Sequence, residues 1–216
     1  MDSEITPQDV INAYRCGLFP MADSRDATQF FWYDPPMRGQ LSISHLHIPE
    51  RLRRTVLQYP YEIKINHAFE KTIDGCAEQA PDRADTWINS GIRSLFITLH
   101  HHGYAHSIEA YQDGTLVGGL YGLAIGGAFM GESMFSRARD SSKICLVHLC
   151  ARLYHCGFTI LDTQFVNPHL EQFGVHEIPK DEYLEKLKQV IDKKTNFEQL
   201  EHSERDLVRH YLTQNK

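Results

Sequence analysis

The chain has 216 residues, 42% of them hydrophobic and 23% charged, which is ordinary for a soluble globular protein at the upper size of one domain. No apolar run approaches the roughly eighteen residues that a membrane-spanning helix needs, and the acidic N-terminus does not resemble a secretion signal. A net charge of −6 argues against binding of nucleic acid over the whole surface, and five cysteines without a C-x-x-C pair argue against a disulfide framework and predict a cytoplasmic protein.

The first 105 residues carry alternating helical and extended patterns. Thr6 and Pro7 start a capped helix over about residues 7–16, and Gly17 ends it. The segment 18–41 is rich in turns and aromatic residues, so we expect an irregular lid or the wall of a binding site there. The remaining expected elements are strands over 38–48 and 61–66 and helices over 50–59, 67–79 and 92–102.

From about residue 106 the pattern changes to a meander of strands. A turn at Asp113 and Gly114 joins two of them, and a long apolar run predicts a further strand in the middle of a sheet. Asp140 or Ser141 caps the helix that follows the meander, and Gly157 ends it. The expected strands are 106–112, 115–125, 128–132 and 158–165, and the expected helices are 142–156, 182–191 and 196–216.

The change of pattern near residue 105 predicts an α+β protein with two lobes. Residues 1–105 would form an N-terminal α/β lobe that contains the aromatic-rich loop. Residues 106–216 would form a second lobe, in which helices flank a mixed sheet and a helical tail ends the chain.

Two polar residues lie on one face of the expected strand 158–165. Alternation places Asp162 and Gln164 on the same face, and Asn167 follows just beyond the strand. A carboxylate and an amide at the end of a buried strand need hydrogen-bond partners. They are either a polar pair that ties down a loop or a pair that faces a ligand, and the sequence pattern alone leaves both open.

A single carboxylate, Glu132, stands between glycine and serine in the stretch GESMF. It could form a structural ion pair, bind an ammonium group or act as a base. The neighbouring Phe129, Met134 and Phe135 would be either core or the wall of a pocket. The pattern therefore indicates a site where negative charge meets apolar surface.

The start of the helix 142–156 is surrounded by hydroxyl and basic side chains: Ser136, Ser141, Ser142, Arg137, Arg139 and Lys143. A helix N-terminus with basic neighbours can bind a phosphate group. However, the segment matches neither G-x-x-x-x-G-K-[ST] nor G-x-G-x-x-G, which disfavours an enzyme that hydrolyses nucleotides.

Four histidines lie on or just after the end of the expected helix 92–102: His100, His101, His102 and His106. Gly103 interrupts their spacing, and the chain contains no H-E-x-x-H motif. Histidines that face the carbonyl end of a helix explain the cluster better than a metal site does. We therefore expect no metal.

Taken together, the motifs resemble those of the bacterial leucyl/phenylalanyl-tRNA–protein transferases. The resemblance rests on motifs in order from about residue 9 to 184: AYRCGLFPMA, FFWYDPPMRG, FEKTIDGCA, TWI, HSIEAY, LVGGLYG, GESMFSRARDSSK, LDTQFVNPHLEQFG and EIPKDEYL. The string GESMFSR, followed by SK and a D-x-Q strand, is the most specific part. The terminal segment 196–216 lies outside the resemblance.

This resemblance implies a C-terminal lobe similar to the GNAT acyltransferase fold. It also implies transfer of Leu, Phe or Met from aminoacyl-tRNA to acceptor proteins that begin with Lys or Arg, which marks them for N-degron degradation. The implied partners are charged tRNA and these acceptor proteins. No metal or dissociable cofactor is implied, and we expect a monomer without a membrane partner.

The resemblance also assigns a donor site. The aminoacyl side chain would enter an apolar pocket lined by Leu120, Phe129, Leu146, Leu149, Leu153 and Leu161. Helical spacing places residues 146, 149 and 153 of this set on one face, which agrees with a shared pocket. Trp32 and Trp87 match aromatic residues that hold the terminal adenosine of the tRNA by stacking.

Three polar residues receive roles in the same way. Asp162 and Gln164 match the proposed catalytic pair of the family, and Glu132 matches a residue at the α-amino end of the donor. Because glutamine is a poor base, we expect Gln164 to orient the acceptor amine and Asp162 to stabilise its developing positive charge. Proton transfer through the 2′-hydroxyl of the tRNA ribose is an equal alternative.

Some features depart from the pattern of the family. The chain has Phe96 where some family members carry an aromatic hydroxyl, and the expected pocket helix is rich in leucine.

Contact with tRNA must be local in an acidic chain, and the candidate residues for its phosphates are Arg51, Arg53, Arg54, Lys71 and Arg83. The alternatives are a different GNAT-type acyltransferase, disfavoured because SRARDSSK lacks glycines, or a non-catalytic module that binds RNA or peptide.

Overall fold

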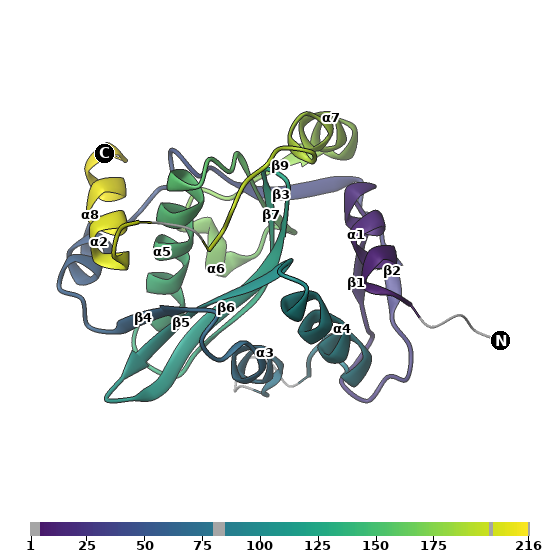
Figure 1. Cartoon of the computed structure of the whole chain (residues 1–216), viewed down its shortest axis with the longest axis horizontal. Helices are drawn as coiled ribbons and strands as arrows, with labels where there is room; N and C mark the ends of the chain where they lie inside the picture. The colour runs from purple at the N-terminus through teal and green to yellow at the C-terminus, as the bar shows by residue number, and fades with distance from the viewer. Residues whose placement is uncertain (1–4, 80–84, 199–200, 216) are drawn as a thin grey trace.

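A computed structural model describes residues 5–79, 85–198 and 201–215 of the chain (Figure 1). It contains a seven-stranded sheet with helices on both faces, and a separate two-stranded sheet near the N-terminus. The helices are α1 (Pro7–Arg15), α2 (Glu50–Leu57), α3 (Phe69–Ala77), α4 (Ser90–His101), α5 (Ser141–His155), α6 (Pro168–Glu171), α7 (Lys180–Val190) and α8 (Glu204–Gln214). The strands are β1 (Phe19–Met21), β2 (Phe31–Tyr33), β3 (Met37–Leu41), β4 (Glu62–Ile65), β5 (Ala105–Gln112), β6 (Thr115–Ile125), β7 (Ala128–Ser136), β8 (Ile160–Gln164) and β9 (His176–Pro179).

The large sheet has the order β4-β5-β6-β7-β8-β3-β9. All its neighbouring pairs are antiparallel except β7 and β8, which run parallel. Parallel strands need a long crossover connection, and α5 supplies it here. The apolar strand β8 has a neighbour on each side, so its predicted place inside the sheet is confirmed.

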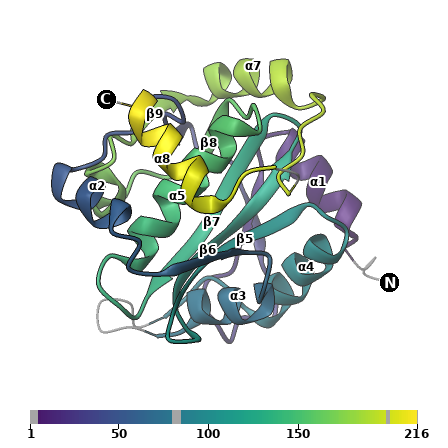
Figure 2. The ribbon, with the colours of Figure 1, turned by 60° about the vertical axis from the view of Figure 1, so that its left-hand side comes forward.

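Helices cover both faces of this sheet (Figures 1 and 2). On one face, α1, α3, α4 and α7 enclose a core that contains Phe69, Ile92 and Tyr183. On the other face, α2, α5 and α8 enclose a second core that contains Leu149 and Tyr211. The predicted α+β class, with a mixed sheet flanked by helices, is confirmed.

The first helix shows how local sequence sets an element. Thr6 precedes α1, and its hydroxyl accepts a hydrogen bond from the Asp9 backbone N–H at 3.2 Å. The Asp9 carboxylate accepts one from the Thr6 N–H at 2.9 Å, which completes a capping box. Pro7 occupies the first turn, where its missing N–H costs nothing.

Three sequence-based expectations are wrong in part. The aromatic segment is not irregular throughout, because β1 and β2 pair within it. The strand expected over 38–48 ends at Leu41, because Ser42 starts a turn in which its hydroxyl accepts from the His45 N–H at 3.1 Å. The expected helix 196–216 begins only at Glu204, after Ser203 caps it. The sequence analysis did not predict α6 and β9.

The predicted division into two lobes near residue 105 stays a prediction. The large sheet takes β3 and β4 from before that point and its other strands from after it. No helix in the described part of the chain combines the length and the apolar character that crossing a membrane requires.

Candidate active site

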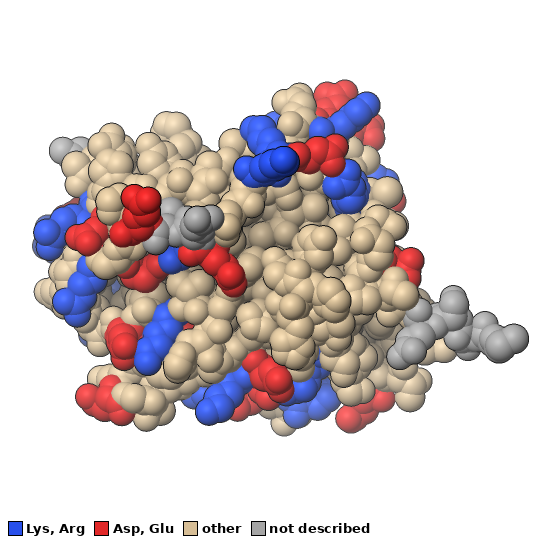
Figure 3. All heavy atoms as spheres, in the orientation of Figure 1, with Lys and Arg blue, Asp and Glu red and all other residues tan. Residues whose placement is uncertain are grey.

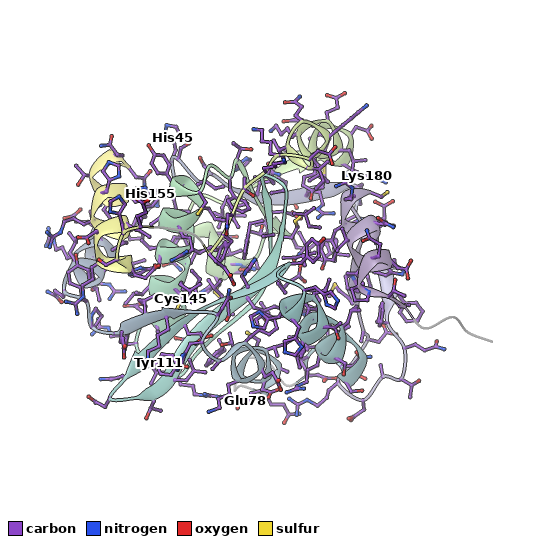
Figure 4. All side chains as sticks on the ribbon, in the orientation of Figure 1. His45, Glu78, Tyr111, Cys145, His155 and Lys180 are labelled. Atoms are coloured by element: carbon purple, nitrogen blue, oxygen red, sulfur yellow. The ribbon has the colours of Figure 1, made fainter. Side chains whose placement is uncertain are left out.

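A cavity of about 880 Å³ lies where β7 and β8 part. Its wall includes residues from both cores, among them Leu120 and Leu149 from one and Trp87 and Tyr121 from the other. Glu78, which follows α3 and is labelled in the lower part of Figure 4, belongs to the same wall. The cavity therefore reaches both faces of the sheet at one point.

The parting of two parallel strands creates this space. The last pair in the register of β7 and β8 is Met130 with Asp162. Two residues further along each strand stand Glu132 and Gln164, which remain close across the gap, since Gln164 Nε2 donates a hydrogen bond to Glu132 Oε1 at 3.0 Å. The strand ends thus bring together two of the predicted site residues.

Glu132 owes its direction to a break in the pairing of β6 and β7. Tyr121 pairs with Ser133 and Gly122 with Gly131, so Glu132 is the extra residue of a bulge. A bulge bends its strand and redirects a side chain. On the other strand, Gln164 adopts a left-handed backbone with φ of 58°, which turns the chain at the end of β8.

The Glu132 carboxylate is enclosed by polar neighbours although part of the residue borders the cavity. The Tyr14 hydroxyl, from α1, donates to the same Oε1 atom at 2.8 Å. The pKa of Glu132 is raised to about 8, mainly by burial and also by the negative charge of Asp162, while the hydrogen bonds from Tyr14 and Gln164 oppose the rise. Burial and the Glu132 carboxylate raise the pKa of Tyr14 well above its usual value, which keeps it a hydrogen-bond donor.

Asp162 is completely buried and does not line the cavity. It forms an ion pair with Arg38, whose side chain is 1% exposed. Its carboxylate also accepts hydrogen bonds from the Gln164 backbone N–H at 3.0 Å and from the Tyr183 hydroxyl at 3.2 Å. The predicted pair is therefore close together, but its two side chains face different partners.

The apolar wall of the cavity contains four of the six residues predicted for the donor side chain: Leu120, Leu146, Leu149 and Leu161. The other two, Phe129 and Leu153, are fully buried in the core behind it and are not part of the lining. Phe129 stacks on Phe197 with ring centres 5.4 Å apart. Met134 and Phe135, for which the sequence left core and pocket wall open, also line the cavity, as does Leu41, which the sequence did not suggest.

The two tryptophans differ in position. Trp87 lines the cavity, whereas Trp32 lies on β2, packs edge-on against Phe30 and is not part of the lining. Asn167 lines the cavity and caps α6, since its side chain accepts from the Leu170 N–H at 3.0 Å.

Phe96 occupies the position at which the resemblance led us to look for an aromatic hydroxyl. Phe96 is fully buried and packs edge-on against Tyr121, with ring centres 5.3 Å apart. The buried hydroxyl of Tyr121 has no hydrogen-bond partner among the described residues. An aromatic hydroxyl is therefore present in the cavity wall, but on β6 instead of α4.

Most of the cations predicted to contact tRNA are engaged within the protein. Arg51 forms an ion pair with Asp140 at 2.8 Å, and Arg54 forms one with Glu50 at 3.0 Å. Arg53 donates to two backbone carbonyls at the end of α8. On the face shown in Figure 3, basic and acidic side chains alternate.

The remaining predicted cations are Lys71, which is exposed on α3, and Arg83, which lies outside the described residues. An exposed ion pair such as Arg54 with Glu50 is weak and could exchange its partner for a phosphate group. The role of all five cations in tRNA binding stays a prediction.

The helix start that the sequence suggested for phosphate is occupied by the carboxylate of Asp140. Asp140 precedes α5, and Arg51, Arg139 and Lys143 all lie within 4 Å of its carboxylate. Asp140 stands at the predicted cap position, but it makes no side-chain hydrogen bond to the helix. The basic residues here thus neutralise an acid of the chain itself.

Two of the four histidines near the end of α4 contact backbone carbonyls. His102 Nδ1 lies 2.8 Å from the carbonyl oxygen of Thr98, and His100 Nδ1 lies 2.8 Å from that of Ala105. His100 also stacks on Phe69, with ring centres 4.3 Å apart. Within the described ranges, no group of three or more His, Cys, Asp or Glu residues could hold a metal ion.

Sequence reasoning did not identify three residues that hold the site together: Tyr14, Arg38 and Tyr183. They come from α1, β3 and α7, and all three are buried. Tyrosines at apolar positions of helices look like core residues, so no periodic signal separates them. Arg38 did carry a signal, because an arginine within a short strand that is otherwise buried requires a partner.

The arrangement has a clear chemical capacity. The leucine wall suits an aliphatic or aromatic side chain, and Glu132 at its edge suits an ammonium group. The amide of Gln164 is held beside that carboxylate and can hydrogen-bond to an amine or a carbonyl group. The cavity could therefore hold the amino-acid end of a larger molecule.

Comparisons with known proteins agree with this description. The family model described as Leucyl/phenylalanyl-tRNA protein transferase matches residues 40–188, and that of its N-terminal domain matches residues 3–36. A protein of Rhodopseudomonas palustris (strain TIE-1), named leucyl/phenylalanyl-tRNA–protein transferase, is 50% identical over 195 residues, which cover 90% of this chain and 87% of the relative. A protein of the same name from Hyphomonas neptunium is 49% identical over 197 residues, which cover 91% of this chain and 76% of the relative.

Proposed function

The chain belongs to the leucyl/phenylalanyl-tRNA–protein transferase family, and on this premise we propose that it transfers Leu, Phe or Met from aminoacyl-tRNA to the N-terminal Lys or Arg of acceptor proteins. The product would carry a new N-terminal residue that marks it for N-degron degradation. We place the reaction in the cytoplasm and assign it to a single copy of the chain.

The observation that carries this proposal is the union of a leucine wall with the carboxylate of Glu132 in a single cavity. The donor side chain packs against Leu146, Leu149 and Leu161, and the donor ammonium group binds Glu132, because pairing with a cation opposes the raised pKa of this carboxyl group and favours its charged form. Trp87 at the same cavity supplies a surface on which the terminal adenosine stacks. Burial of an uncharged side chain and pairing of an ammonium group together select an apolar α-amino acid.

Gln164 is placed to orient the acceptor. Its side chain donates a hydrogen bond to Glu132, a residue of the cavity wall, beside which the ester carbonyl of the donor would lie. Orientation is the main requirement, because an aminoacyl ester is already activated and the attacking amine needs only correct placement. Asp162, which is paired with Arg38, does not contact the cavity and would act through the Gln164 backbone that it holds.

The covalent step balances without a cofactor. The acceptor amine loses one proton and forms a bond to the ester carbonyl carbon. The bond between that carbon and the ribose oxygen breaks, and the ribose oxygen takes up a proton as it leaves. The 2′-hydroxyl of the ribose is a route for this proton that requires no base from the protein.

Recognition of the tRNA body is proposed to be local and independent of sequence. Exposed cations such as Arg51, Arg54 and Lys71 would contact phosphate groups of the acceptor stem. Because these contacts are electrostatic, binding of charged tRNA should weaken as salt concentration rises.

The test is transfer of labelled phenylalanine and leucine, each charged on its tRNA, to peptides that begin with Arg, Lys, Asp, Glu or Ala. The proposal expects incorporation on Arg and Lys only. Incorporation on Asp or Glu would retain the chemistry and change the acceptor assignment. A folded sample that labels none of the peptides would favour a non-catalytic module that binds RNA or peptide.

A further inference from the structure

Among the described residues, Arg38 has the largest side chain by volume that is fully buried, and it lies beside the candidate active site. Its guanidinium contacts both carboxylate oxygens of Asp162 and donates to the backbone carbonyl of Gly17. The rings of Phe19 and Tyr183 lie 4.9 and 4.3 Å from its central carbon. One buried cation therefore joins β3 to β8, to α7 and to the segment that follows α1.

These contacts occupy the hydrogen-bonding capacity of Asp162. A carboxylate offers about four lone-pair positions. Two are taken by Arg38 Nε and Nη2, one by the Tyr183 hydroxyl and one by the Gln164 backbone N–H. Asp162 thus has no free position for a proton from a substrate, and any effect on the reaction must pass through its neighbours.

The neighbour that connects Asp162 to the cavity is Gln164, which is not part of the lining itself but contacts Glu132, which is. Its N–H is held by Asp162 at 3.0 Å, its backbone is left-handed, and its side chain donates to Glu132. A left-handed backbone is unfavourable for a residue other than glycine and persists only where contacts hold it. Gly39 makes room for this turn, because a Cβ atom there would lie 2.7 Å from the Phe165 carbonyl carbon.

We propose that Arg38 is a positioning residue for aminoacyl transfer, which by its two-point contact with Asp162 fixes the Gln164 backbone and so the direction of the Gln164 amide. The inference rests on the proposed function and adds a residue that acts without touching the substrate. It explains why a buried charge is retained next to the cavity when an apolar side chain would be easier to bury.

The geometry requires arginine and not only positive charge. A guanidinium presents parallel N–H groups that match a carboxylate at two points, whereas a lysine ammonium group is a point charge on a flexible stem. Arg38→Lys would keep the charge near Asp162 and lose the fixed orientation. Arg38→Met would lose both.

The experiment measures kcat per folded protein and the KM for phenylalanyl-tRNA in Arg38→Lys, Arg38→Met, Asp162→Asn and the Arg38→Met/Asp162→Asn double variant. Both Arg38 variants should lower kcat by about 100-fold, because misplacement of a positioning group has that effect, and leave KM within about threefold. In the Asp162→Asn background, Arg38→Met should lower kcat by less than about threefold further, because the two residues act as one unit.

Arg152→Met is the matched control, because Arg152 is a second buried arginine paired with a carboxylate, and it does not line the cavity. Its kcat per folded protein should equal that of the wild type. Wild-type kcat in Arg38→Lys, or multiplication of the effects of Arg38→Met and Asp162→Asn in the double variant, would overturn the inference. Arg38→Lys decides the question if Arg38→Met does not fold, and failure of the wild type to transfer would count against the proposed function instead.

Discussion

Two buried arginines form ion pairs in different regions of this molecule. Arg38 pairs with Asp162 beside the cavity, and Arg152, on α5, pairs with Glu204 at the start of α8. Each arginine also donates a hydrogen bond to a backbone carbonyl. Arg38 lies over the ring of Phe19, and Arg152 lies over the ring of Phe197. The chemistry of the two pairs is nearly the same.

The two pairs differ in how many hydrogen bonds the carboxylate accepts. Asp162 accepts four hydrogen bonds, whereas Glu204 Oε2 and Arg152 Nε have no hydrogen-bond partner within the described ranges. His148 Nδ1 lies 3.6 Å from Glu204 Oε2, too far for a good hydrogen bond. The pair at α8 therefore attaches one helix to another, while the pair at the cavity fixes the geometry of a turn.

The two pairs do not differ in their position relative to the family models. Asp162 and Arg152 lie within the matched range 40–188, whereas Glu204 lies beyond its end and Arg38 lies between the two matched ranges. His155, which Figure 4 labels next to α8, also faces that helix, since its Nε2 lies 3.3 Å from the Leu207 carbonyl oxygen. We infer that α8 stabilises the fold and that the region around Asp162 serves the reaction.

The largest expected effect is that of Asp162→Ala on turnover. Loss of this carboxylate frees the Gln164 backbone and leaves the buried charge of Arg38 without a counter-ion. We expect kcat to fall by about 10³-fold, comparable to loss of a preorganised electrostatic group, with donor affinity nearly unchanged. Single-turnover transfer and donor titration on the folded fraction measure the two quantities.

Glu204→Ala is the control for that prediction. It removes the carboxylate of the other pair and should lower stability with no change in kcat per folded protein. Equal loss of kcat in both variants would mean that the two pairs do not differ in function.

The second effect is on stability. Arg152→Met leaves the partly buried Glu204 unpaired, and breaking a buried pair by removing one partner costs about 3 kcal/mol or more. We expect the free energy of unfolding to drop by about that amount, as measured by chemical denaturation. A variant as stable as the wild type would show that the contact between α5 and α8 does not depend on this pair.

The third effect isolates the side chain of Gln164 from its backbone. Gln164→Asn keeps the amide and the N–H to Asp162 but shortens the reach to Glu132 by one methylene group. We expect kcat to fall by about 10²-fold, because the amide no longer lies at the reacting carbonyl, and the thermal unfolding temperature to stay near that of the wild type. Wild-type turnover would show that the direction of the amide is not critical.

The smallest effect is a dependence of stability on pH. The pKa of Glu132 is raised from its ordinary value of 4.5 to about 8, mainly by burial. The folded state therefore holds this proton more tightly than the unfolded state, and the stability it contributes is present below pH 4.5 and is lost as pH rises through 8. Glu132→Gln should remove that loss, so its stability relative to the wild type should grow with pH across this window. A constant difference in denaturation midpoint would contradict the assignment.

Sequence patterns predicted most of the helices and strands because those depend on local signals. The capping box at Thr6 and the apolar run of β8 are examples. The alternation in residues 38–48 misled, because Ile43 and Leu46 are buried against α8 and α5 without strand pairing. The apolar alternation there reflects burial of the side chains, and the backbone after Leu41 does not form the hydrogen bonds of a strand.

The site was predictable only in part, for a physical reason. The motifs placed Glu132, Asp162 and Gln164 in one region, and the structure brings them together. The partners that hold them lie far away along the chain: Arg38 is 124 residues from Asp162, and Tyr14 is 118 residues from Glu132. Such contacts depend on how the two faces of the sheet are covered, which no local pattern specifies.

The most direct single test is a crystal structure with a stable amide analogue of phenylalanyl-adenosine. The account predicts the phenyl ring against Leu146, Leu149 and Leu161, the ammonium group within hydrogen-bond distance of Glu132, and Asp162 still paired with Arg38 and out of contact with the ligand. A ligand bound elsewhere, or one that displaces Arg38 and contacts Asp162 directly, would contradict it.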